Sequence, residues 1–187
     1  MNELNSHIDS KQSGSEPASD VGEAVLRRPL PFNGVELPCV RNIEEAWEWG
    51  RQFNAVLTAG PDRWEVRMDH PNHRVWAFED TTRPSTGPSL KQVEEMISWG
   101  KGQRDLLVHC HAGMSRSTAV AWGICLARGL DPEDSLAALY AAHPFESWGE
   151  RRLFIPNRLI VQHLEAIFDM RGLANMRDAA ISMDLPE

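Results

Sequence analysis

The sequence predicts an α/β domain with a mostly parallel central sheet that is flanked by helices on both faces. Short apolar runs at 53–57, 75–78 and 106–108 alternate with segments of helical pattern, and this alternation is typical of parallel sheets. The last of these runs leads directly into residues 109–118, which are mostly small or polar and precede a helical segment. We therefore expect a ligand-binding loop at 109–118, where a parallel strand ends and a helix begins.

The first elements follow from extended and capping patterns. Residues 32–40 read as an extended segment. Asn42, followed three residues later by Glu45, forms a capping-box pattern that predicts a helix up to Trp49, with Gly50 ending it. The next expected elements are a strand at 53–57, a strand at 75–78 and a helix at 88–99.

The second half of the chain is predicted to be mostly helical. The strand at 106–108 and the loop after it lead into a helix over 119–127, rich in small and apolar residues. Asp131 as N-cap and Pro132 at the first helical position predict a helix up to Ala142. A last helix is expected from 156 or 157 to 170, with an apolar face of Leu159, Ile160, Leu164, Ile167 and Phe168.

Composition excludes several classes of protein. The chain has 187 residues, 42% of them hydrophobic, and a formal net charge of −8. It contains no apolar run of eighteen residues, so we expect no membrane partner, and the acidic charge argues against nucleic acid. The N-terminus lacks the features of a secretory signal, which predicts a cytoplasmic location. The three cysteines, Cys39, Cys110 and Cys125, have neither disulfide nor zinc spacing, so we expect no metal and no cofactor.

The segment His109-Cys110-His111-Ala112-Gly113-Met114-Ser115-Arg116-Ser117-Thr118 carries the chemistry. A loop that closes onto a helix N-terminus presents unpaired backbone N–H groups and the positive end of the helix dipole, and both favour a phosphate dianion. The same positive field favours a thiolate at Cys110. The planar guanidinium of Arg116 can bind two phosphoryl oxygens at once. These residue types together suit phosphoester hydrolysis.

The spacing His109-Cys110, two residues, Gly113, two residues, Arg116-Ser117 resembles the signature of the cysteine-dependent protein tyrosine phosphatases, in their dual-specificity branch. The resemblance is dense over 75–127 and looser over 32–69 and 130–170. It implies the α/β fold of that family and assigns 31–171 to a phosphatase catalytic domain. Residues 1–30 are then expected to be a disordered N-terminal tail, because their composition offers little to bury, and 172–187 a C-terminal tail.

The resemblance also implies a role for each signature residue. Cys110 would form a phosphocysteine intermediate, Arg116 would bind the phosphoryl group, and Ser117 would help the thiolate leave. His109 would orient the cysteine backbone, although a buried core histidine explains it almost as well. The remaining loop residues, expected to bind substrate through their backbone, are His111, Ala112, Gly113, Met114 and Ser115.

The general acid is assigned to Asp80. It lies 30 residues before Cys110, just after the expected strand at 75–78, in a segment rich in Thr, Pro, Ser and Gly, which resembles the acid loop of the phosphatases. Glu79 and Asp69 are alternatives. Trp148 is a further candidate, for the rim of the pocket.

The expected function is hydrolysis of phosphotyrosine on a phosphorylated protein or peptide, with dual specificity toward phosphoserine and phosphothreonine left open. A phosphatase of a small molecule or of an RNA 5′ phosphate is the alternative within the same chemistry. A phosphate-binding interaction module without turnover is the alternative outside it.

Overall fold

The computed structural model describes residues 28–60, 68–143 and 154–183, and its helices and strands alternate as the sequence predicts. Four parallel strands form one sheet in the order β1-β4-β2-β3. The strands are β1 (Cys39–Arg41), β2 (Ala55–Ala59), β3 (His73–Trp76) and β4 (Leu106–His109). The central strand β4 pairs with β1 on one side and β2 on the other, so the loop that follows it leaves from the middle of the sheet.

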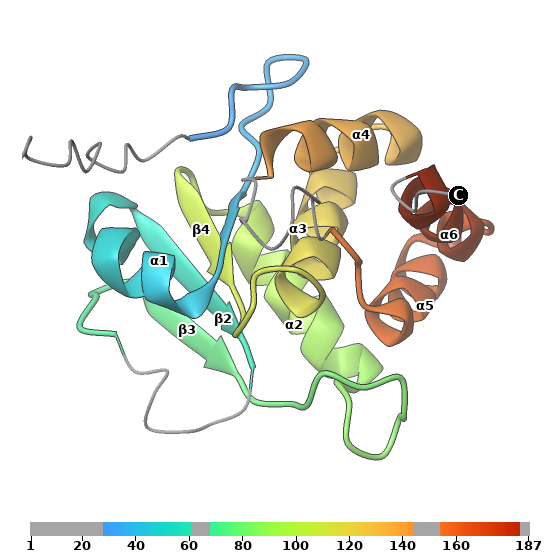
Figure 1. Cartoon of the computed structure of the whole chain (residues 1–187), viewed down its shortest axis with the longest axis horizontal. Helices are drawn as coiled ribbons and strands as arrows, with labels where there is room; N and C mark the ends of the chain where they lie inside the picture. Colours follow the sequence, from blue (N-terminus) through green and yellow to red (C-terminus); the bar gives the residue numbers. More distant parts are fainter. Residues whose placement is uncertain (1–27, 61–67, 144–153, 184–187) are drawn as a thin grey trace, which may run out of the picture.

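Helices cover both faces of the sheet (Figure 1). One face carries α1 (Ile43–Trp49) and the short 3-10 helix η1 (Gly50–Gln52). The other carries α2 (Leu90–Lys101), α3 (Arg116–Ala127) and the helices that pack on them, α4 (Pro132–Ala142), α5 (Arg158–Phe168) and α6 (Leu173–Met183). The predicted fold class is confirmed. None of the helices in the described part of the chain is long and apolar enough to span a bilayer.

The strand residues alternate between two cores. Val56 and Leu107 pack with Cys39, Ala46 and Phe53 beneath α1. Leu57, Leu106 and Val108 point to the opposite face, into the larger core under α2, α3 and α5. Successive residues of a strand point to opposite faces, so strands buried on both sides read as continuous apolar runs, which is why short apolar runs located them in the sequence.

Helix starts follow the capping signals. Asn42 and Glu45 form the capping box of α1, and Ser89 with Gln92 forms one for α2. Asp131 caps α4 with Pro132 in its first turn, as predicted. Gly50 ends α1 but has a right-handed conformation and continues into η1. A Cβ at Gly50 would lie 2.8 Å from Cε of Met68, so the absence of a side chain there serves packing.

Two segments differ from the expectation. The extended segment expected over 32–40 contributes only its end to the sheet, because Asn33 and Gly34 have positive φ angles and form a tight turn closed by Phe32 and Val35. Residues 172–187, expected to be a tail, contain α6. This helix packs on α5 through the buried Leu173, and Arg177 donates from Nε to the carbonyl of Pro156. The expected N-terminal tail lies almost entirely outside the described residues.

Candidate active site

The loop over 110–115 connects the end of β4 to the start of α3, and its carbonyl groups are turned outward. The structure gives four of its backbone carbonyls a hydrogen-bond donor from outside the loop. The pairs are His111 with the N–H of Ile43 (3.1 Å), Gly113 with Nε2 of His143 (2.9 Å), Met114 with the N–H of Ile155 (3.0 Å) and Ser115 with the N–H of Asn157 (3.0 Å). The loop is thus held from outside at four positions.

Gly113 allows the loop to close against β1. Its φ angle is +74°, and a Cβ there would lie 2.8 Å from the backbone nitrogen of Asn42 and 2.9 Å from the carbonyl carbon of Arg41. Both obstacles are backbone atoms and neither can rotate away. The position therefore needs glycine for conformation and for space.

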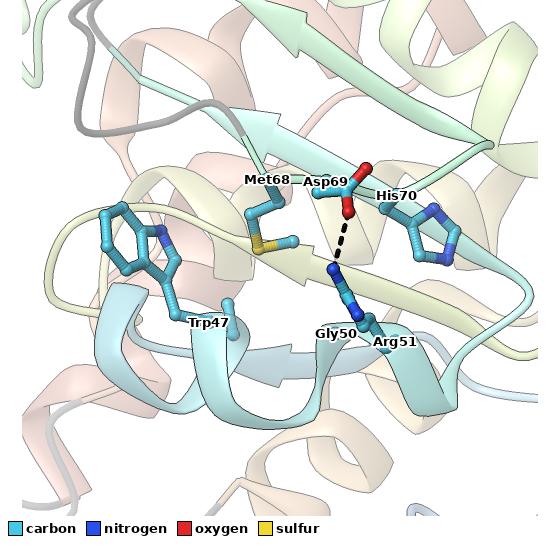
Figure 2. A pocket seen from close by; sticks show the side chains of 7 residues that line it. Trp47, Gly50, Arg51, Met68, Asp69 and His70 are labelled. Carbon is cyan, nitrogen blue, oxygen red and sulfur yellow. Dashed lines mark hydrogen bonds and ion pairs between the residues drawn. The ribbon is translucent and has the colours of Figure 1, made fainter.

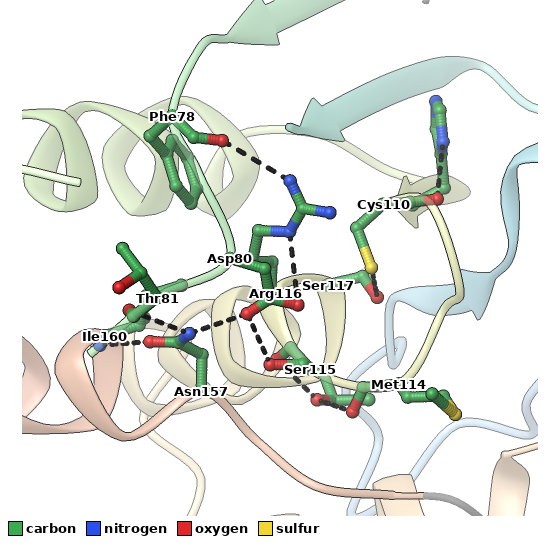
Figure 3. Close-up of polar contacts among 12 residues, drawn as sticks. Phe78, Asp80, Thr81, Cys110, Met114, Ser115, Arg116, Ser117, Asn157 and Ile160 are labelled. Carbon is green, nitrogen blue, oxygen red and sulfur yellow. Dashed lines mark hydrogen bonds and ion pairs between the residues drawn. The ribbon is translucent and has the colours of Figure 1, made fainter. Parts of the chain in front are cut away.

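Cys110 and Ser117 meet at the floor of the loop. Sγ of Cys110 lies 3.2 Å from Oγ of Ser117, and Cys110 is only 2% exposed while Ser117 is fully buried (Figure 3). Ser117 lies in the first turn of α3, so the start of this helix brings its hydroxyl next to the thiol of Cys110. A hydroxyl at this distance can stabilise a thiolate by a hydrogen bond.

Arg116 lies beside the loop with its guanidinium almost buried. Nη1 donates to the carbonyl of Phe78 over 3.4 Å, and the residue is 5% exposed. A Cβ at Gly60, just beyond β2, would lie 3.3 Å from Nη1, so glycine at that position makes room for the guanidinium. Nε of Arg116 is buried without a conventional hydrogen bond.

Asp80 reaches the loop from the segment after β3. Its Oδ2 lies 3.5 Å from Nε of Arg116, and its side chain is 39% exposed. Its Oδ1 accepts two hydrogen bonds of 2.8 Å, from Oγ of Ser115 and from Nδ2 of Asn157 (Figure 3). The carboxylate is therefore fixed beside Arg116 and Ser115, next to the end of the loop.

The other predicted residues are placed less centrally. His111 is exposed, and Ala112 and Met114 are partly buried. Asp69 forms an exposed ion pair with Arg51 on another part of the surface, and Trp148 lies outside the described residues. Within the described ranges, no three His, Cys, Asp or Glu side chains come together as a candidate metal site.

His109, the residue before Cys110, is wholly buried. Its Nε2 lies 2.7 Å from Oγ1 of Thr58 on β2, and its Nδ1 lies 3.4 Å from the carbonyl oxygen of Cys110. Burial is the main reason that the pKa of His109 is lowered to about 4, and Arg116 contributes in the same direction. The ring is therefore neutral near physiological pH, and it can orient the backbone at Cys110 without adding charge.

Sequence reasoning missed two residues that hold this site. Asn157 was expected only as a helix start, yet its side chain caps α5 through Oδ1 and holds Asp80 through Nδ2. His143 follows the helix expected up to Ala142 and was given no role, yet it is buried and Nε2 of its ring lies within hydrogen-bond distance of the loop carbonyl of Gly113. The sequence signal available for both was a polar side chain next to a proline at a helix boundary, which indicates a cap and carries no information on a distant partner.

Among the comparisons with known proteins, only those with solved structures found matches. No protein-family model matches this sequence, and no curated protein sequence matches it either. The structure matches the crystal structure of DUSP15 with a TM-score of 0.54 at 23% identity, over 83% of this chain and 94% of that one. It matches human DUSP28 with a TM-score of 0.52 at 17% identity, over 77% and 93% of the two chains.

A third match is the human tyrosine phosphatase-like serine/threonine/tyrosine-interacting protein, with a TM-score of 0.53 at 14% identity, over 70% of this chain and 89% of that one. At these identities the likeness concerns the fold. The chain therefore has the fold of the dual-specificity and protein tyrosine phosphatases, the group whose signature its loop residues resemble.

Proposed function

We propose that this chain is a cysteine phosphatase that hydrolyses phosphomonoesters through a phosphocysteine intermediate on Cys110. The observation that supports the proposal is that Asp80 pairs with Arg116 beside the loop, that Ser117 contacts the thiol of Cys110, and that four carbonyls of the loop accept hydrogen bonds from outside it. In this proposal Cys110 is the nucleophile, Arg116 the cation and Asp80 the acid. The match to dual-specificity phosphatase folds supports the same conclusion.

In the first step, the thiolate of Cys110 attacks the phosphorus and the bond to the ester oxygen breaks. The leaving oxygen takes its proton from Asp80. Oδ1 of Asp80 accepts hydrogen bonds from Ser115 and Asn157, and these bonds fix the carboxyl group for the transfer. The guanidinium and the N–H groups of the loop stabilise the charge on the equatorial oxygens.

In the second step, water attacks the phosphocysteine and the sulfur–phosphorus bond breaks. Asp80, now ionised, accepts the proton of the water, so the acid of the first step is the base of the second. Ser117 lies 3.2 Å from the departing sulfur and stabilises it as a thiolate by donating a hydrogen bond from its hydroxyl group. Inorganic phosphate leaves, and the enzyme returns to its starting protonation state.

We propose a phosphorylated protein or peptide in the cytoplasm as the substrate, with phosphotyrosine as the preferred residue. The loop has no lysine between Cys110 and Arg116, and the chain has a formal charge of −8, so its surface does not favour polyanions. An RNA 5′ phosphate is less well suited to such a surface.

The proposal is tested by hydrolysis of p-nitrophenyl phosphate in EDTA and reductant, comparing the wild type with Cys110→Ser. We expect turnover by the wild type and none by the variant. Asp80→Asn should lower the turnover of phenyl phosphate, whose leaving group needs a proton, by about 10²–10⁴-fold and that of p-nitrophenyl phosphate less. Folded wild-type protein that binds phosphate but turns over neither compound would instead indicate a binding module.

The substrate class is tested by comparing kcat/KM for three phosphorylated substrates. We expect kcat/KM to be highest for a phosphotyrosine peptide, against matched phosphothreonine peptide and 5′-phosphorylated oligoribonucleotide. Preference for the oligoribonucleotide would overturn the assignment to protein substrates and leave the cysteine chemistry intact.

A further inference from the structure

The carbonyl of Gly113 depends on one side chain for its hydrogen bond. Nε2 of His143 lies 2.9 Å from this oxygen and is the only donor that the described residues give it. The other three carbonyls that are held from outside the loop each have a backbone N–H as donor. Those of Met114 and Ser115 also accept from Oγ1 of Thr118, over 2.7 and 2.8 Å. A single substitution can therefore release the carbonyl of Gly113, whereas the other three keep a backbone donor.

The direction of this hydrogen bond is fixed by chemistry. A carbonyl oxygen can only accept, so Nε2 of His143 carries a hydrogen. The neutral ring with its proton on Nε2 and the charged ring both meet this requirement. His143 is only 6% exposed, so water competes little for the bond. The imidazole therefore serves as a buried N–H donor beneath the loop.

Aromatic packing holds the imidazole in place. The ring of Phe154 meets that of His143 edge to face, with centroids 5.5 Å apart, and meets that of Tyr140 in the same way at 5.8 Å. The backbone N–H of His143 also donates to the carbonyl of Tyr140 over 3.2 Å, at the end of α4. The position of Nε2 is thus set by the helix end and by the buried Phe154.

The same hydrogen bond fixes the direction of the next N–H group. No peptide bond in the described ranges is cis, so the carbonyl of Gly113 and the N–H of Met114 point to opposite sides of one planar unit. Because the carbonyl faces His143, the N–H of Met114 points away from it. Rotation of this unit would exchange the two groups by changing only ψ of Gly113 and φ of Met114. Glycine resists such a rotation less than any other residue, so the unit needs a partner that holds it.

We propose that His143 is a positioning residue whose ring holds the Gly113–Met114 peptide so that the N–H of Met114 binds the phosphoryl group of the substrate. The inference rests on the proposed function, which supplies the phosphoryl group. A rotated peptide would replace an N–H that stabilises the anion by a carbonyl oxygen that repels it. Binding of the anion should therefore depend on a donor at the position of Nε2.

Two substitutions separate the hydrogen bond from the packing of the ring. Glutamine and methionine side chains have the same length, and neither reproduces the edge contact with Phe154. The amide of His143→Gln can place an N–H near the position of Nε2. His143→Met has no donor. A difference between the two variants therefore reports the hydrogen bond.

His70→Met is the matched control. Nε2 of His70 lies 3.0 Å from the carbonyl of Phe53, so this substitution removes a contact of the same kind. His70 lines a surface pocket beside α1 and η1 (Figure 2). It precedes β3 and Phe53 precedes β2, whereas the loop over 110–115 follows the end of the parallel strand β4, so the control lies at the opposite edge of the sheet.

The test is the binding of inorganic phosphate to the full-length protein, followed at the backbone amide of Met114 by ¹H–¹⁵N NMR. We expect phosphate to move the amide proton signal of Met114 downfield in the wild type, in His143→Gln and in His70→Met, with similar affinities. His143→Met should bind phosphate at least about tenfold more weakly, without this downfield shift, because a hydrogen bond to a charged group is lost. Its kcat/KM for p-nitrophenyl phosphate should fall by about 10²–10³-fold, and that of His143→Gln much less.

Equal phosphate affinity in His143→Gln and His143→Met would overturn the proposal, and so would a wild-type Met114 amide that does not respond to phosphate. If His143→Met does not fold, His143→Asn takes its place, because the donor of asparagine ends one bond short of Nε2. Phosphate binding needs no turnover, so the two proposals fail separately. An inactive protein with the expected difference between the variants keeps the role of His143 and loses the phosphatase, and an active protein without that difference does the reverse.

Discussion

Asn157 donates a hydrogen bond of 2.8 Å from Nδ2 to Oδ1 of Asp80, although the two residues are 77 positions apart in the sequence. The same side chain accepts a hydrogen bond from the N–H of Ile160 and so begins α5. One amide therefore links the start of α5 to the carboxylate of Asp80 beside the loop over 110–115.

The two functions of Asn157 can be separated by substitution. Asn157→Ala should lower the free energy of unfolding by about 1 kcal/mol through loss of the cap and also lower turnover. Asn157→Ser keeps a capping oxygen but cannot hold Asp80, so we expect near wild-type stability with kcat for phenyl phosphate lowered about tenfold or more and little change in KM. Urea denaturation and steady-state kinetics measure both, and a Ser variant with wild-type kcat would remove Asn157 from the positioning of the acid.

Alanine substitutions at Gly113 and Gly129 separate the effect of backbone conformation from the effect of limited space. Both have positive φ angles, +74° and +83°, but a Cβ at Gly129 would meet nothing within 4 Å. Gly129→Ala should cost about 1–2 kcal/mol of stability from backbone strain alone and leave turnover unchanged. Gly113→Ala should cost more and abolish turnover, since the loop must move away from β1. Equal stability losses with full activity in both variants would contradict this account of the loop.

The three cysteines should differ in reactivity. Burial raises the pKa of Cys39 to about 11 and that of Cys125 to about 12, so both stay protonated at neutral pH and packed in the two cores. We expect iodoacetate to modify the native protein at Cys110 alone, with inorganic phosphate slowing the reaction. Peptide mass spectrometry locates the label, and Cys110→Ser should take up none. Comparable labelling of Cys39 or Cys125 would show that these thiols are accessible.

Buried His109 should make stability depend on pH. Its pKa is lowered from 6.5 to about 4 on folding, so the unfolded chain binds the proton more tightly. The free energy of unfolding should therefore fall as pH decreases from about 6.5 to 4, by about 3 kcal/mol from this residue, and level off below. Urea denaturation against pH measures the slope. His109→Gln should have a shallower slope in this window, and an unchanged slope would show that another group causes it.

The sequence predicted the elements better than their connections. Apolar runs and capping patterns located β2, β4, α1 and α4, because strand periodicity and caps are local properties. The tight turn at Asn33 and Gly34 and the packing of α6 depend on contacts with other elements, so local patterns did not reveal them.

The same distinction holds at the site. The signature from His109 to Ser117 is contiguous and could be recognised, and the structure brings Asp80, chosen by its spacing, into contact with Arg116, while its role as the acid stays a prediction. The partners that fix them, Thr58, His143 and Asn157, come from β2, the end of α4 and the start of α5. Their roles depend on strand order and helix packing, which no local pattern encodes.

The central claim is the covalent intermediate on Cys110, and rapid acid quench during turnover of p-nitrophenyl phosphate tests it most directly. Mass spectrometry of the quenched protein should find one phosphoryl group on the peptide that contains Cys110, more of it in Asp80→Asn because the base for hydrolysis is missing, and none in Cys110→Ser. Turnover without any phosphorylated Cys110 peptide, or turnover that persists in Cys110→Ser, would contradict the account.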